Sequence, residues 1–113
     1  MKTFFGFALA DSMFAGDCVI SRREISPDEA RRIVEAGVES CLNPLHTATI
    51  GAMRGRFGID VVIPEMPARV LLDHGDSIVV MGVRGLPRLT DRHEYSEEEV
   101  ASATFSFAVY TVQ

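Results

Sequence analysis

Apolar residues recur along the first half of the chain in short runs that favour buried strands. Residues 3–9 form the first such run and predict a strand at the N-terminus. Residues 18–21 and 38–42 are shorter runs of the same kind and predict two further strands. Polar segments separate these runs, so we expect the strands to alternate with other elements.

The second half of the chain has a stronger strand pattern. β-branched residues dominate positions 68–73 and 77–83, and the His-Gly-Asp sequence at 74–76 between them predicts a hairpin turn. Residues 104–112 alternate between two sides, which predicts a strand that is buried on one face. One side consists of Phe105, Phe107 and Val109, and the other of Ser106, Ala108 and Tyr110.

Capping signals mark a helix after the second predicted strand. Ser26 and Glu29 have the spacing of a capping box, in which each side chain hydrogen-bonds the other residue's backbone, and Pro27 suits the first helical position. These signals predict a helix from Pro27 to about residue 36, ended by Gly37.

Two more helices carry similar signals. Asn43 as N-cap with a following proline predicts a helix that runs to about Phe57, with Gly58 as its left-handed stop. Ser96 and Glu99 form a second capping box before a short helix that ends near residue 103. The chain is therefore predicted to be a single α/β domain over residues 1–113, with a mixed β-sheet of about five strands flanked by about three short helices.

Composition restricts the possible functions. The 113 residues are 47% hydrophobic and 24% charged, with a formal net charge of 11 − 16 = −5. An acidic chain is a poor general coat for nucleic acid, so we expect no binding of duplex DNA. We find no secretory pattern and no apolar run of membrane-spanning length, and we expect a cytoplasmic protein, in the host cytoplasm if its origin is viral.

Cysteine and histidine spacing gives no support to a metal centre. Cys18 and Cys41 are better interpreted as small core residues than as a disulfide or metal pair, and Cys41 at a buried strand end is a poor nucleophile. His46, His74 and His93 are too scattered to form a zinc site. We predict no metal and no cofactor.

The start of the predicted second helix is the best candidate site for an anion. Backbone N–H groups at a helix start lack intrahelical partners and carry partial positive charge. His46, Thr47 and Thr49 fall in the first two turns, and residues 40–59 contain no Asp or Glu. The alternative is an ordinary surface histidine, which is the commoner case.

Arginines supply further candidate anion contacts. Arg84 and Arg88 lie in the Gly- and Pro-containing segment that follows the strand predicted at 77–83, where a planar guanidinium suits phosphate contacts. A solvated loop with incidental charge is equally compatible with this pattern. Arg54 and Arg56 are weaker candidates, because Arg54 is ~12 Å along the helix axis from the histidine.

Three segments carry a resemblance to a known family. They are residues 8–14, residues 45–50 with the sequence Leu-His-Thr-Ala-Thr-Ile, and residues 79–89, which contain both candidate arginines. Together with the order of predicted elements, they resemble the small viral ring nucleases. These are anti-CRISPR proteins of archaeal viruses and phages, with relatives among bacterial CRISPR-associated ring nucleases.

The resemblance implies a specific activity. Members of this family form homodimers that bind cyclic tetra-adenylate, a cyclic oligoadenylate messenger of type III CRISPR defence, and cut it to linear di-adenylate without a metal. By this resemblance His46 is the general acid, and Arg84 or Arg88 is the catalytic arginine. The implied substrate-binding residues are Ala10, Asp11, Ser12, Leu45, Thr47, Thr49 and Gly85.

This chain also departs from the family pattern. Where archaeal viral members have Gly-His-Asp-Ser-Thr, only His46 and Thr49 are retained, and Ala48 replaces a polar residue. Ala10 likewise replaces a polar residue after the first strand. The alternatives are therefore a protein of the same fold that sequesters a cyclic nucleotide without cutting it, and a protein-interaction module.

Overall fold

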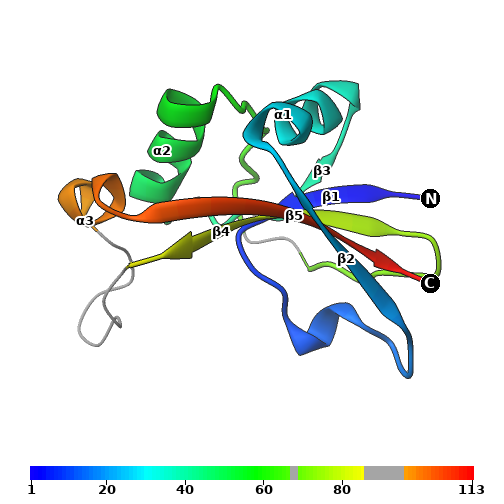
Figure 1. Ribbon diagram of the computed structural model, residues 1–113. Coiled ribbons are helices and arrows are strands. Elements are labelled where there is room, and N and C mark those ends of the chain that lie inside the picture. The colour runs from blue at the N-terminus through cyan, green and yellow to red at the C-terminus, as the bar shows by residue number, and fades with distance from the viewer. Residues whose placement is uncertain (67–68, 86–95) are drawn as a thin grey trace.

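The computed structural model describes residues 1–66, 69–85 and 96–113, and within them a mixed sheet is flanked by helices (Figure 1). The strands are β1 (Thr3–Gly6), β2 (Ile20–Ile25), β3 (Glu39–Ser40), β4 (Ser77–Arg84) and β5 (Thr104–Val112). The helices are α1 (Pro27–Ala36), α2 (Thr47–Phe57) and α3 (Glu97–Ala101), with a 3₁₀ turn η1 (Asp11–Met13). The predicted α/β class, with five strands and three helices in the described residues, is confirmed.

The sheet has the order β2-β5-β4-β1-β3. β1 is parallel to both neighbours, with Phe4 opposite Ile78 of β4 and Glu39 of β3, whereas β5 is antiparallel to β4 and β2. Since β1, β3 and β4 point the same way, the segments that follow them emerge at one edge of the sheet. In open α/β sheets, ligands bind at this carboxyl edge.

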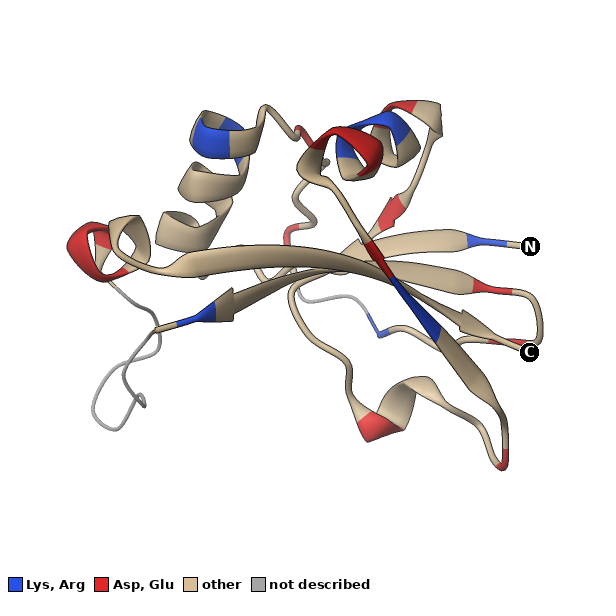
Figure 2. Cartoon of the chain, viewed as in Figure 1, with Lys and Arg blue, Asp and Glu red and all other residues tan. Residues whose placement is uncertain are grey.

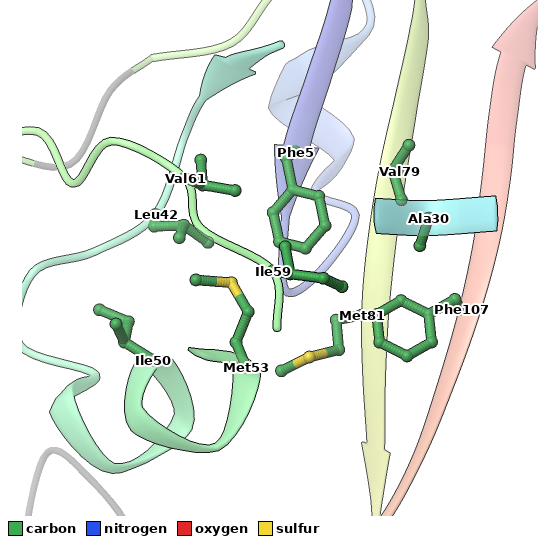
Figure 3. Close-up of a cluster of buried hydrophobic side chains, with 10 residues drawn as sticks. All are labelled: Phe5, Ala30, Leu42, Ile50, Met53, Ile59, Val61, Val79, Met81 and Phe107. Atoms are coloured by element: carbon green, nitrogen blue, oxygen red, sulfur yellow. The ribbon is translucent and has the colours of Figure 1, made fainter. Parts of the chain in front are cut away.

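Both faces of the central sheet are buried. Helices α1 and α2 cover one face, and Figure 3 shows Met81 of β4 extending toward α2 on that face. This first cluster contains Phe5, Ala30, Leu42, Ile50, Met53, Ile59, Val61, Val79, Met81 and Phe107. A second cluster on the other face contains Phe4, Val70, Leu72, Ile78, Val80 and Val112. Residues of β4 therefore bury both sides of the strand, which explains its continuous apolar run.

Two elements with strong local signals, α1 and β5, have the predicted bounds, whereas α3 ends at Ala101 rather than near residue 103. The prediction that β5 is buried on one face is wrong: Phe107 is buried on one side and Ala108 and Val112 on the other, because both faces of the sheet are covered. Ser26 Oγ accepts the N–H of Glu29 at 3.1 Å, although the Glu29 carboxylate pairs with Arg23 at 2.7 Å instead of completing the capping box. In α3, by contrast, both hydrogen bonds between Ser96 and Glu99 are present.

The predicted hairpin is wrong. Residues 69–73 form no strand, and Leu72 makes only a single bridge to Phe14, while residue 68 lies outside the described residues. Asp73 and Asp76 do close a turn, with a 2.9 Å hydrogen bond between their backbones. Both edges of β4 are already taken by β1 and β5, so Val70 and Leu72 pack onto the sheet face instead of pairing with β4.

Strand bounds and one cysteine also differ from expectation. β1 ends at Gly6 rather than at residue 9, β3 has only two residues, and β2 begins at Ile20 rather than at residue 18. Most of β2 is exposed because it lies at the edge of the sheet, so its polar residues do not show an apolar pattern. Cys18 is exposed and is not a core residue, whereas Cys41 is half-buried. No helix in the described ranges is long and apolar enough to cross a membrane.

Candidate functional site

The α2 helix begins three residues later than predicted. His46 is its N-cap, not Asn43. Asn43 instead closes a turn, because its Oδ1 accepts the N–H of Leu45 and its carbonyl accepts the N–H of His46, both at 3.0 Å. Such an Asx turn competes with helix continuation. The predicted end is confirmed: α2 stops at Phe57, and Gly58 has φ +63°.

This start changes which amides can meet an anion. The N–H groups of Leu45 and His46 are occupied by Asn43, so they are not the donors expected for an anion. The helix geometry instead leaves the amides of Ala48 and Thr49, in the first turn, without intrahelical acceptors. Leu45 is exposed and Thr49 is half-buried beside this turn.

The imidazole of His46 contacts an aromatic residue. Its ring centroid lies 6.3 Å from that of Phe7, with the planes inclined at 34°. Phe7 directly follows β1, and its ring meets that of Phe5 edge-on at 6.4 Å. Sequence reasoning missed this contact, and the available signal was that Phe7 follows a strand at the carboxyl edge of the sheet.

A cleft lies along α2, from its first residue Thr47 to Arg56. It has a volume of about 330 Å³ and separates α2 from α3. Its lining consists of Thr47, Ala48, Gly51, Ala52, Arg56, Glu97, Val100 and Ala101. Figure 2 shows the acidic α3 next to the uncharged beginning of α2. Residues 40–59 contain no Asp or Glu, but the fold brings the carboxylate residue Glu97 into the same cleft.

The two arginines of α2 have local partners at the other end of the helix. Arg54 pairs with Asp60 at 3.2 Å. Arg56 donates to the carbonyl of Ala103 at 3.3 Å and lies 4.9 Å from the ring centre of Phe105. These contacts tie α2 to its surroundings, which favours a structural role for both residues.

Arg84 and His46 lie on different sides of the sheet. Arg84 is the exposed last residue of β4 and, by strand alternation, shares its side with Val80 of the second cluster. His46 contacts Phe7, which packs on the first cluster with the helices. Gly85 follows with φ +84°, and Arg88 lies outside the described residues.

The predicted binding residues after β1 are also separated from the helix start. Ala10, Asp11 and Ser12 are exposed and belong to the segment at η1. Figure 1 shows η1 on the opposite side of the sheet from α2, and Met13 packs against the second cluster. One chain therefore places the candidate residues in two groups, one on each face.

Residues 1–66, 69–85 and 96–113 give little support to a metal site or to thiol chemistry. Within these ranges no three His, Cys, Asp or Glu side chains are grouped to hold a metal ion. His74 Nδ1 lies 2.6 Å from the carbonyl oxygen of Gln113. Burial raises the pKa of the Cys41 thiol, which donates to the carbonyl of Phe5 at 3.1 Å and is therefore a poor nucleophile.

A protein of known structure has a similar fold. B116 of Sulfolobus turreted icosahedral virus matches 98% of this chain and 99% of its own, with a TM-score of 0.64 and 15% sequence identity. At this identity the likeness shows the fold alone. No protein-family model and no curated protein sequence matches the chain.

Proposed function

We propose that this protein is a metal-independent ring nuclease that cuts cyclic tetra-adenylate into linear di-adenylate and so switches off type III CRISPR signalling. The observation that carries the proposal is the position of His46, which caps α2 at the carboxyl edge of β1, β3 and β4. The fold, similar over nearly its whole length to a viral protein, is consistent with the family resemblance in the sequence.

The proposed reaction uses a nucleophile that the substrate carries. The ribose 2′-OH attacks the neighbouring phosphorus in line, the 2′-oxygen–phosphorus bond forms, and the bond from phosphorus to the 5′-oxygen breaks. Protonated His46 gives its proton to the departing 5′-oxygen, while solvent takes the proton of the 2′-OH. The products carry a 2′,3′-cyclic phosphate and a 5′-hydroxyl. First-turn amides of α2 would stabilise charge on the phosphoryl oxygens.

A homodimer fits the two-sided distribution of candidate residues. His46 and Arg84 lie on opposite faces within one chain. Two copies around one cyclic ligand would supply two histidines and two arginines, and the arginine of one copy could complete the site of the other. The resemblance to ring nucleases implies the same assembly.

The test is incubation of the purified protein with cyclic tetra-adenylate in excess EDTA, followed by chromatography of the products. We expect linear di-adenylate, and we expect His46→Ala to lower the cleavage rate by about 10²–10⁴. His74→Ala is the matched control, because His74 is an exposed histidine that bonds the C-terminal residue. Full cleavage by His46→Ala would contradict the assigned acid.

Binding without products would support the alternative of a sequestering protein. The observation that favours it is Ala48 in the first turn of α2, because its side chain supplies no polar group to stabilise a charged transition state. Absence of binding would contradict both functions.

A further inference from the structure

We propose that Phe7 is a positioning residue, whose ring holds the imidazole of His46 in the orientation needed for proton transfer. The catalytic part of this inference rests on the proposed function. The ring contact itself can be tested without catalysis.

The backbone of His46 is fixed on both sides. Its N–H donates to the carbonyl of Asn43 at 3.0 Å, and its carbonyl accepts the N–H of Ile50 at 2.9 Å. The His46 side chain makes no capping hydrogen bond to α2. Because no such bond orients the imidazole, the remaining freedom lies in its two side-chain torsions.

Phe7 is suited to limit those torsions. Its ring is half-buried and packs edge-on against Phe5, which is completely buried in the first cluster. The ring of His46 is tilted by 34° against that of Phe7, and the centroid distance of 6.3 Å is within the range of favourable ring pairs. The core thus holds Phe7, and Phe7 holds the imidazole at the helix start.

Orientation matters for a general acid. The donor nitrogen must come within hydrogen-bond distance of the leaving oxygen, and a displacement of about 1 Å can cost ~100-fold in rate. Phe7→Leu keeps an apolar side chain in the cluster but removes the ring face. We therefore expect kcat to fall about tenfold while KM changes less than twofold.

Phe7→Tyr is the matched conservative variant. It retains the ring, and it changes a residue that is half-buried rather than enclosed in the core. We expect this variant to retain the wild-type kcat. The positioning role would be overturned if Phe7→Tyr lost as much activity as Phe7→Leu. It would also be overturned if the variants changed only KM, because that result indicates direct contact between Phe7 and the substrate.

Proton NMR tests the contact in the protein without ligand. The chain has three histidines, so the imidazole signal of His46 can be assigned as the one lost in His46→Ala. We expect this signal to move in Phe7→Leu, because the ring current of Phe7 is removed, and to stay near its place in Phe7→Tyr. The His74 signal is the internal control.

The outcomes separate the two proposals. If the wild-type protein cleaves no cyclic tetra-adenylate but the His46 signal responds to Phe7→Leu, the proposed activity fails and the ring contact stands. An unmoved His46 signal in folded Phe7→Leu overturns the inference. If Phe7→Leu does not fold, Phe7→Met provides the same comparison with an unbranched apolar side chain.

Discussion

Asp76 shows how one residue can organise chain segments that are distant in sequence. Among the described residues, Asp76 is the one charged residue that is buried. Its carboxylate accepts hydrogen bonds from the backbone N–H groups of Lys2 at 2.8 Å and Asp73 at 3.0 Å. These hydrogen bonds, first that from Lys2, lower the pKa of Asp76 below its ordinary value of 3.8. The residue thereby joins the start of β1 to the turn before β4.

Asp76→Asn is expected to reduce the free energy of unfolding at pH 7 by ~2 kcal/mol, because bonds to a charged acceptor are lost. A lowered folded-state pKa means that the carboxylate stabilises the fold above its unfolded pKa and loses this effect as pH falls through the folded value. The difference in unfolding free energy between Asp76→Asn and wild type should therefore become smaller below pH 3.8. Urea unfolding of both proteins at pH 7 and pH 3 measures this difference in free energy. Asp73→Asn, which changes an exposed side chain, is the control. Equal stabilities of wild type and Asp76→Asn at pH 7 would contradict the stabilising role of the Asp76 carboxylate.

At the residue scale, the sequence located the candidate histidine but not its surroundings. Pro44 and Asn43 correctly signalled a nearby helix start, although the Asn side chain closes a turn and delays the helix to His46. Phe7 could not be assigned as its neighbour, because that contact joins two segments whose relative position depends on β1 pairing with β3.

At the element scale, α3 modifies the electrostatics of α2. The five-residue α3 has Glu97, Glu98 and Glu99 in its first turn, where carboxylates complement the helix dipole. Of these, Glu97 lines the cleft beside the start of α2. A charge that suits its own helix therefore opposes an anion at the next helix.

Glu97→Gln is expected to strengthen binding of cyclic tetra-adenylate at low salt by a factor on the order of five, since it removes one nearby negative charge. The gain should diminish at high ionic strength. Glu98→Gln is the matched control, because this exposed residue is in the same helical turn but not in the lining of the cleft. Calorimetric titration of both variants would measure the difference, and equal affinities would show that Glu97 does not face the ligand.

At the scale of the whole molecule, the two covered sheet faces separate the candidate residues. α2 with His46 covers one face, while η1 lies on the other and Arg84 shares the side of the second cluster. A site that uses both groups requires ligand contacts around the sheet edge or from a second copy.

We expect the protein to sediment as a homodimer and to be stabilised by cyclic tetra-adenylate. At a ligand concentration one hundred times Kd, a ligand specific for the folded state adds about 2.7 kcal/mol to stability. Arg84→Ala should reduce this thermal shift, whereas Arg32→Ala, an exposed arginine on α1, should leave it unchanged. Sedimentation as a monomer with ligand bound would contradict the shared site.

The sequence by itself determined the α/β class, the bounds of α1 and β5 and the start of α3, because capping signals and side-chain alternation act between residues a few positions apart. Only the tertiary structure decided that residues 70–72 pack on a face rather than pair with β4, and that Phe7 and Glu97 lie beside the start of α2. These outcomes depend on which strand edges are already occupied and on how distant segments pack, and no local pattern records either.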